Sequence, residues 1–474
     1  MKKLLLTTFI ILTTLAAALA QSPFTGTWAG KLEVGVSLRL VFHVKAAGDG
    51  TYTGTMDSPD QSAFGIPCDK VTVTGNTIAA TLANGAINYT GTLENDTTIK
   101  GTFTQGQSVP LTLVKQTSPG TIKKLNRPQT PKPPFTYTSE DISYSNKDKS
   151  ISYGATITIP TGKGPFPAAL IISGSGAQTR DFDFADHKFY AVLADALTRA
   201  GYIVLRVDDR GTGKTTGSFA NATTKDFADD ASAGIDYLLS RPEVNKKKLG
   251  LIGHSEGGIV APMVAANRKD IDFVILLAAP GVPVPDLMVQ QNRAILSQQG
   301  MNEQNLEAYL QLYKALLLDG VNNAKLEDAL TAGKKSMQQW LAKTDPAIVS
   351  SMGYNQAEAQ EKMVSSLVQS FATSWGKYFF GYNPVPNLEK LHSKVLALNG
   401  SADIQVDATA NLAAIQKALA KSKAKNVSVK TIPGVNHLFQ TCKTCTLNEY
   451  GELEETFSPV ALKEIIDWLN KSVK

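Results

Sequence analysis

A serine flanked by glycines is the residue in this chain best placed to do chemistry. Gly253-His254-Ser255-Glu256-Gly257 is the one Gly-x-Ser-x-Gly pattern in the sequence. An apolar strand pattern at 249–252 comes directly before it, and a small-residue helix pattern at 257–266 follows. A tight turn between strand and helix would raise the Ser255 hydroxyl above the sheet edge, where it can attack an acyl carbon.

A serine hydroxyl needs a positioned base, and five histidines are available. On a sheet with such a turn, the acid and then the histidine follow the nucleophile along the chain. His43, His187 and His254 precede or adjoin the serine, and His392 precedes the strand expected to carry the acid. His437 remains as the predicted base, in the loop after a strand pattern at 427–432.

The predicted acid follows the strand pattern that ends at Leu398. Asp403 lies just beyond it in Asn399-Gly400-Ser401-Ala402-Asp403, with Asp407 as the second candidate. Its role would be to hold the tautomer of the histidine and to stabilise the imidazolium.

Backbone N–H groups are the expected donors to the oxyanion that forms during acyl transfer. One is the N–H of Glu256, directly after the nucleophile. The other is expected from Ser173-Gly174-Ser175-Gly176, with Ser175 favoured and Gly176 next. A second glycine-rich segment, 208–215, lacks the glycine spacing of a phosphate loop, so we expect Asp209 or Arg210 to pin neighbouring loops there.

The elements that must position these residues alternate between strand and helix from residue 135 onward. Continuous apolar strands separated by amphipathic helices predict a mostly parallel sheet covered on both faces. The alternation lapses at about 282–386, where helical stripes predict an insertion between two strands.

The region 21–116 has another character, with about eight short alternating strand patterns and frequent turn signals. It predicts a small all-β antiparallel barrel or meander, either filled by its side chains or holding a ligand. The Gly26-Thr27-Trp28 segment resembles the start of lipocalin-like barrels. A Pro-rich stretch, 117–134, is expected to be an extended linker.

Residues 1–20 are typical of an export signal, with Lys2 and Lys3, an apolar run and Ala18-Leu19-Ala20 as cleavage site. They predict a secreted or periplasmic protein, and no later segment is apolar enough to span a membrane. A net charge of +5 over 474 residues gives no basic stripe, so nucleic acid is not an expected partner.

The chain has three cysteines. Cys442 and Cys445 form a CxxC pair that suggests a disulfide, a redox pair or half a zinc site, and an exported protein favours the disulfide. Cys68 would then be a free, buried thiol.

With these residues assembled, the second domain (135–474) resembles the α/β-hydrolase superfamily, specifically exported bacterial carboxylesterases with a helical cap. The segments that carry the resemblance are SGSGAQTRD, DDRGTGKT, GHSEGG, NGSADIQV, NHLF and SWGKYFFGYNP. It implies hydrolysis of carboxylic esters through an acyl-enzyme by Ser255, His437 and Asp403, without metal or organic cofactor. The cap aromatics would line the acyl pocket or fill the core of the cap (Trp375, Tyr378, Phe379, Phe380 and Tyr382).

Two other functions fit the same sequence. A serine peptidase or aminopeptidase would share fold and triad, with Glu256 or a cap glutamate holding the substrate amine. An inactive ligand-binding protein is the other alternative. As partners we expect small-molecule or polysaccharide-linked esters, the latter with the β-rich domain as a docking module.

Overall fold

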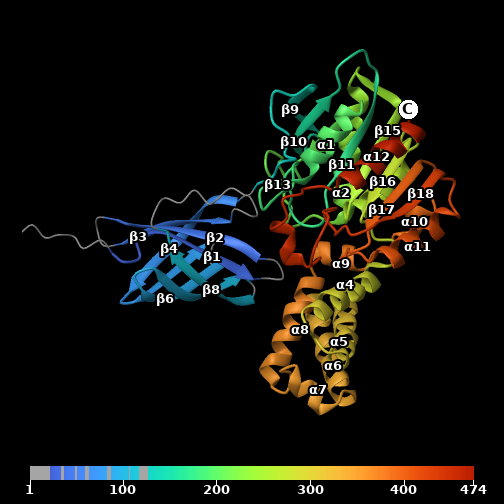
Figure 1. Cartoon of the computed structure of the whole chain (residues 1–474). Coiled ribbons are helices and arrows are strands. Elements are labelled where there is room, and N and C mark those ends of the chain that lie inside the picture. Colours follow the sequence, from blue (N-terminus) through green and yellow to red (C-terminus); the bar gives the residue numbers. More distant parts are fainter. Residues whose placement is uncertain are drawn as a thin grey trace, which may run out of the picture. The chain divides into compact units, whose positions relative to one another are not determined.

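The structure is a computed structural model that describes residues 22–33, 37–47, 51–58, 63–82, 87–105, 107–116 and 126–474. The predicted signal segment lies outside these residues. The chain divides into two compact units, the first holding the β-rich region and the second the rest of the described chain. Figure 1 labels the helices and strands of both units.

The first unit is a closed antiparallel barrel in which each strand pairs with the next and β1 pairs with β8. Its eight strands are β1 (Gly26–Glu33), β2 (Ser37–Ala46), β3 (Tyr52–Ser58), β4 (Ala63–Thr74), β5 (Thr77–Leu82), β6 (Ile87–Asn95), β7 (Thr98–Gln105) and β8 (Gln107–Lys115).

Large side chains fill the inside of this barrel. Trp28 is fully buried, and Phe42 and Tyr89 pack ring against ring at 5.2 Å between centroids. The cavity among these side chains measures ≈ 10 Å³, about the space of one water molecule. Of the two interpretations of this domain, the structure supports the filled barrel.

The second unit is built on an eight-stranded sheet with the order β18-β17-β16-β15-β11-β14-β10-β9. The strands from β14 to β18 pair in parallel, whereas β9 and β10 are antiparallel at one edge. The strands are β9 (Thr138–Ser145), β10 (Ser152–Ile159), β11 (Phe166–Ile172), β14 (Ile203–Val207), β15 (Val244–His254), β16 (Phe273–Leu277), β17 (Lys394–Gly400) and β18 (Lys425–Ile432).

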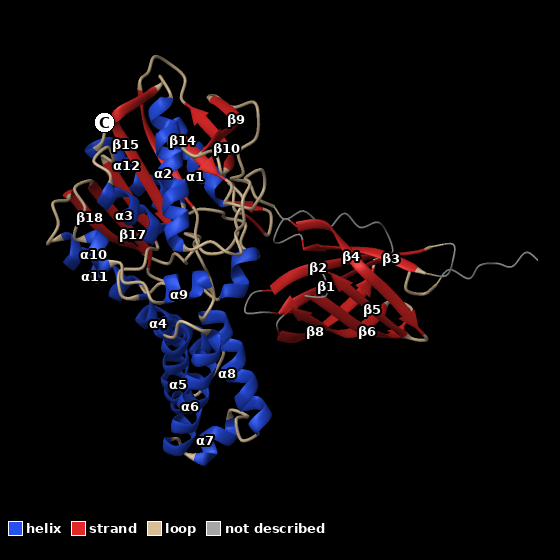
Figure 2. Ribbon diagram, turned by 180° about the vertical axis from the view of Figure 1, so that it is seen from behind, coloured by secondary structure: helices blue, strands red, loops and turns tan. Residues whose placement is uncertain are grey.

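Helices cover both faces of this sheet, as predicted (Figure 2). Alternate side chains of the central strands enter two separate cores. One core is shared with α2 (Thr224–Ser240), α3 (Gly257–Asn267) and α11 (Ala408–Leu419). The other is shared with α1 (Phe189–Arg199) and α12 (Pro459–Ser472). The prediction of a mostly parallel sheet after a small all-β domain is confirmed.

The helical cap lies between β16 and β17 and has an apolar core of its own, which includes Leu312, Leu316 and Trp340. It comprises α4 (Val284–Gln298), α5 (Glu303–Asn322), α6 (Leu326–Lys343), α7 (Pro346–Ser351), α8 (Ala357–Phe371), α9 (Ser374–Phe380) and α10 (Val385–Leu388).

Part of the expected linker belongs to the second unit and is bonded to it. The Arg127 guanidinium donates to the carbonyl oxygens of Ala185, Gly451 and Leu453, and the Gln129 amide donates to Phe457 O at 2.7 Å. These contacts hold the chain at residues 127 and 129 against the second unit.

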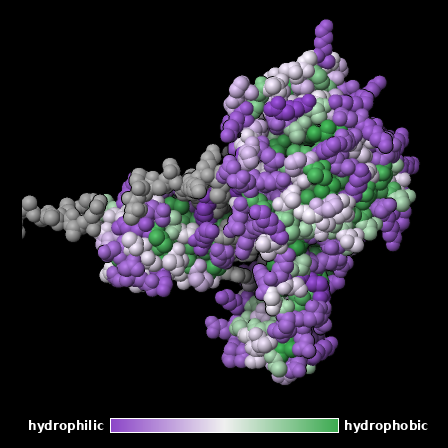
Figure 3. Space-filling view, viewed as in Figure 1, coloured by the Kyte–Doolittle hydropathy of each residue, from purple (hydrophilic) through white to green (hydrophobic). Residues whose placement is uncertain are grey.

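Smaller elements escaped the sequence analysis: the edge strand β9, a hairpin of β12 (Asp183–Phe184) and β13 (His187–Lys188), and a 3-10 helix at Leu447–Gly451. No helix in the described part of the chain is both long and apolar enough to cross a membrane. Hydrophilic and apolar side chains are mixed over the face shown in Figure 3. The large apolar side chains that are exposed lie far apart in the chain (Val114, Leu326, Val427 and Val460).

Candidate active site

Ser255 lies in the sharp turn between β15 and α3 that the motif predicts. Its φ is +53°, a left-handed conformation that costs energy for a residue with a Cβ, and its N–H donates to Leu277 O at 2.9 Å. A Cβ on Gly253 would collide with Gly257 O, and one on Gly257 would collide with Ile172 O. The two glycines therefore permit the close approach of backbones that this turn requires.

The structure brings Asp403 and His437 together. His437 Nδ1 lies 2.8 Å from Asp403 Oδ2, and both side chains are almost fully buried. The other carboxylate oxygen, Oδ1, accepts the N–H groups of Gln405 at 2.8 Å and Val406 at 2.9 Å. A carboxylate held in this way keeps the proton of His437 on Nδ1, which leaves Nε2 free to act as a base.

Asp407, the second candidate acid, has a different role. Its side chain caps α11 by accepting the N–H of Ala410 at 2.7 Å, and it is exposed.

Ser255 and His437 both line one cavity of ≈ 350 Å³, within the usual size range of ligand pockets. No Asp, Glu, Lys or Arg is among the described residues that line it. Three carboxamides, Gln178, Gln291 and Gln405, are its longest polar side chains. The apolar lining comes from the cap, from the 182–184 segment and from the C-terminal part (Phe182, Phe184, Leu287, Met288, Trp375, Phe379, Phe380, Val406, Leu438, Leu447 and Tyr450).

The predicted oxyanion loop lies against Ser255. A Cβ on Gly174 would be 3.2 Å from Ser255 Cβ, and Ser175 lines the cavity. The N–H of Gly174 is occupied by Tyr190 Oη at 3.0 Å. The N–H groups of Ser175, Gly176 and Glu256 donate to no other group of the described chain. These three groups are therefore free to donate to a substrate oxygen.

His254 supports the loop of the predicted base. Its Nε2–H donates to His437 O at 3.0 Å. Complete burial and the neighbouring His437 lower the pKa of His254 to about 3. It is therefore a neutral, structural histidine that fixes the backbone at residue 437.

Glu256 is not among the described residues that line the cavity. Its carboxylate accepts the Thr224 hydroxyl at 2.7 Å and the Trp375 indole N–H at 3.0 Å, and the residue is 1% exposed. Burial raises its pKa, against the effect of these hydrogen bonds. Glu256 thus connects the nucleophile turn to cap helix α9.

The five cap aromatics divide between the two predicted roles. Trp375, Phe379 and Phe380 line the cavity. Tyr378 and Tyr382 stack on each other at 6.1 Å and pack against the core beside it. The sequence did not single out the other aromatic walls, Phe182, Phe184 and Tyr450, because no motif marks them.

Of the two residues predicted to pin neighbouring loops, Asp209 does so, whereas Arg210 binds helix α2. Arg210 binds the Asp230 carboxylate through Nε at 2.7 Å and Nη2 at 2.8 Å. Asp209 accepts Ser173 Oγ–H at 2.6 Å and the N–H of Gln178 at 2.8 Å.

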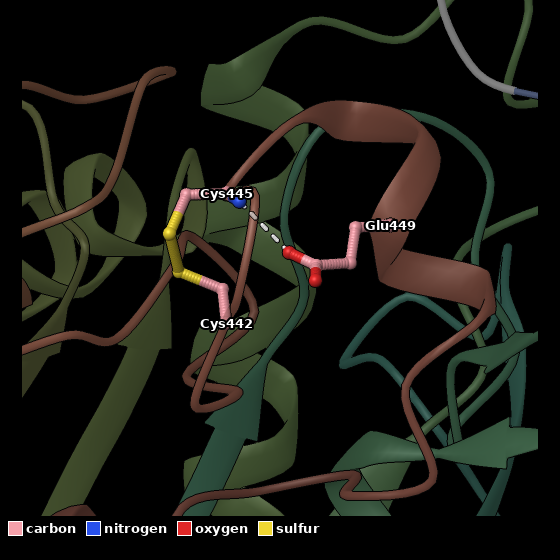
Figure 4. Close-up of side chains that lie close together, drawn as sticks. All are labelled: Cys442, Cys445 and Glu449. Carbon is pink, nitrogen blue, oxygen red and sulfur yellow. Dashed lines mark hydrogen bonds between the residues drawn. A yellow bond between two sulfur atoms is a disulfide. The ribbon is translucent and has the colours of Figure 1, made fainter.

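Cys442 and Cys445 form a disulfide, the favoured one of the three alternatives, with 5.0 Å between their Cα atoms. Figure 4 shows the Glu449 carboxylate beside it, accepting the N–H of Cys445 at 2.8 Å; it also accepts those of Lys443 and Thr444. Partial burial opposes the ionisation of Glu449, but these backbone donors lower its pKa. With both sulfurs in the bond, neither is available as a thiolate ligand for a metal. Cys68 is free and half-buried, and burial raises its pKa to about 11.

The sheet order, the serine turn and the cap define an α/β hydrolase. The profile of the family described as "Serine aminopeptidase, S33" (Hydrolase_4) matches residues 184–441, more than half of the 474 residues. The chain belongs to this family of hydrolases.

Two curated relatives and one solved structure illustrate the similarity. Esterase EstD of Thermotoga maritima is 30% identical over 156 residues, which cover 33% of this chain and 37% of EstD. Putative hydrolase YtaP of Bacillus subtilis is 30% identical over 133 residues, 25% of this chain and 44% of YtaP. The α/β hydrolase GrgF of Penicillium sp. sh18 superimposes on 71% of this chain and 99% of its own, with a TM-score of 0.43 and 15% identity. The matches thus span less than half of the length of these two curated relatives.

Proposed function

We propose that this hydrolase cleaves uncharged carboxylic esters through an acyl-enzyme on Ser255. His437 Nε2 takes the proton of the Ser255 hydroxyl as Oγ attacks the ester carbonyl. The N–H of Glu256 and the N–H of Ser175, or of Gly176 beside it, donate to the oxyanion. When the carbon–oxygen bond to the alcohol breaks, the imidazolium returns the proton to the leaving alcohol. A water molecule, deprotonated by the same histidine, then attacks the acyl carbon, and the acid is released as Ser255 Oγ leaves and takes the proton back from His437.

The observation that carries this proposal is the absence of charged side chains among the described residues of the cavity wall. An aminopeptidase must hold the ammonium group of its substrate, which in a partly enclosed site needs a carboxylate partner. Glu256, the carboxylate closest in sequence to the nucleophile, is buried and occupied by Thr224 and Trp375. An uncharged ester fits such a cavity without an unpaired charge.

Hydrolysis of p-nitrophenyl esters, from acetate through octanoate, tests this against amino-acid p-nitroanilides. We expect ester turnover that is lost in Ser255→Ala, and little turnover of the anilides. The matched control is Ser240→Ala, an exposed serine at the end of α2 and outside the cavity wall, which should keep full activity. Faster cleavage of the anilides than of the esters would favour the aminopeptidase, and no turnover of either would favour the binding protein.

We also propose that the protein is exported and cleaved after Ala20. The support is the charged, apolar and small-residue order of residues 1–20. The N-terminal sequence of the protein recovered from its native cells tests this. It should begin at Gln21, whereas an intact Met1 terminus would contradict the proposal.

A further inference from the structure

A carboxylate behind the oxyanion loop has no role in the chemistry described so far. Asp209 lies in the segment after β14, and the hydrogen bonds of its carboxylate go to the two ends of the loop 173–178. Its Oδ1 accepts Ser173 Oγ–H at 2.6 Å, and its Oδ2 accepts the N–H of Gln178 at 2.8 Å. Its own N–H donates to Gln178 O at 3.1 Å. One residue thus holds both ends of the loop.

Tyr190 is a second anchor of the same loop. Tyr190 Oη accepts the N–H of Gly174 at 3.0 Å and donates to Gln178 Oε1 at 3.1 Å. The N–H groups of Gly174 and Gln178 are thus already hydrogen-bonded, to Tyr190 and Asp209. The N–H groups of Ser175 and Gly176 take no part in these anchors, and the preceding Gly174 lies against Ser255. Asp209 and Tyr190 together thus hold the loop at residues 173, 174 and 178.

Asp209 is held at some electrostatic cost. Burial, with a smaller contribution from the nearby Glu256 and Asp230 carboxylates, raises its pKa to about 7, although the hydrogen bonds from Ser173 and Gln178 act to lower it. A buried carboxylate is unfavourable unless its hydrogen bonds compensate. Functional sites are where such groups are commonly found.

We propose that Asp209 is a positioning residue that places the loop donors, Ser175 N–H and Gly176 N–H, for the oxyanion of the proposed ester hydrolysis. It touches no reacting atom and acts through Ser173 and Gln178. Oxyanion donors act on the transition state more than on the bound ester, so loss of Asp209 should lower kcat and leave KM nearly unchanged.

The test compares Asp209→Ala with Asp209→Asn on p-nitrophenyl acetate. Removal of one oxyanion donor commonly lowers kcat by about 10²–10³-fold, and we expect a loss of about 10²-fold for the alanine. Asparagine can still accept the N–H of Gln178 through Oδ1 and donate to Ser173 Oγ through Nδ2. It should therefore restore kcat to within about fivefold of the wild type, because both anchors persist.

Ser173→Ala removes one anchor without removing the carboxylate, which keeps the test open where the Asp209 variants fold poorly. It should lower kcat by about 10-fold, part of the cost of one donor. The control is Asp230→Asn, which changes a nearby carboxylate bound to Arg210 and not to the loop. Asp230→Asn should lower the melting temperature and leave kcat nearly unchanged.

The rate at which a fluorophosphonate labels Ser255 separates this inference from the proposed function. That reaction uses the same oxyanion donors but no ester substrate. If the enzyme is labelled rapidly but cleaves no ester, the proposed ester hydrolysis is refuted. The labelling rates of the variants would still test whether Asp209 positions the loop donors. Folded Asp209→Ala and Ser173→Ala variants that keep kcat and labelling rate within threefold would overturn the inference, as would a rise in KM alone.

Discussion

Replacement of Asp403 by asparagine exchanges one carboxylate oxygen for an NH2 group, beside the predicted base His437. Asp403 Oδ1 accepts two backbone N–H groups, from Gln405 and Val406, and Oδ2 faces His437 Nδ1 at 2.8 Å. In Asp403→Asn the amide oxygen should keep the two backbone bonds, because they are the more numerous. The NH2 group must then face His437 Nδ1.

The magnitude follows from the proton on the imidazole. An NH2 group opposite Nδ1 requires a lone pair there, so the proton moves to Nε2, the atom that must accept the Ser255 proton. The corresponding change in a Ser-His-Asp enzyme lowers kcat by about 10⁴-fold, or about 5 kcal/mol in the barrier. The fold should survive, since the side chain keeps its shape and its backbone bonds.

The assay is p-nitrophenyl acetate hydrolysis beside a thermal melt. The matched control is Asp407→Asn, four residues further on and exposed, which caps α11. It should cost at most about 1 kcal/mol of stability and leave kcat unchanged. A folded Asp403→Asn protein with kcat within tenfold of the wild type would refute the assignment of the acid. An equal loss of activity in Asp407→Asn would refute it too.

Three further predictions concern the cap, the pH dependence of stability and the disulfide. Trp375→Phe removes the indole N–H that bonds the buried Glu256 carboxylate, so it should cost about 1–3 kcal/mol of stability. Because Trp375 lines the cavity, the change should also alter KM for octanoate more than KM for acetate. Equal effects on both esters would contradict the place of Trp375 in the wall around the acyl chain. Burial lowers the pKa of His187 and of His254 to about 3, so below pH 6.5 the unfolded chain binds protons that the folded chain does not. Stability should fall by up to about 1.4 kcal/mol per histidine and pH unit between pH 6.5 and 3; urea unfolding should show a shallower fall in His187→Gln, and an unchanged slope would contradict the reasoning. Replacement of Cys442 and Cys445 by serine should lower stability by about 2 kcal/mol, and in the unreduced wild type alkylation should modify neither cysteine.

The sequence was informative where chemistry restricts the choice of residue. The turn at Ser255 needs glycines on both sides, and these can be read directly. The order of elements left one histidine, His437, after the last parallel strand, and Asp403 came at the end of the strand before it. The structure places these two side chains in contact.

The cavity wall could not be predicted in the same way. Phe182, Leu447 and Tyr450 come from short segments whose conformation depends on contacts far away in the chain. One such contact is the Arg127 guanidinium, which joins residues 185, 451 and 453 from more than fifty positions away. The edge strand β9 was missed because its pattern of burial is weak: five of its eight residues are exposed and none is fully buried.

The most direct test of the central claim is covalent labelling of the intact chain with a fluorophosphonate, followed by peptide mapping. The account predicts one adduct per chain, on Ser255, with loss of ester hydrolysis in proportion to labelling and no adduct in Ser255→Ala. An adduct on another serine, or ester hydrolysis that persists in fully labelled protein, would contradict it.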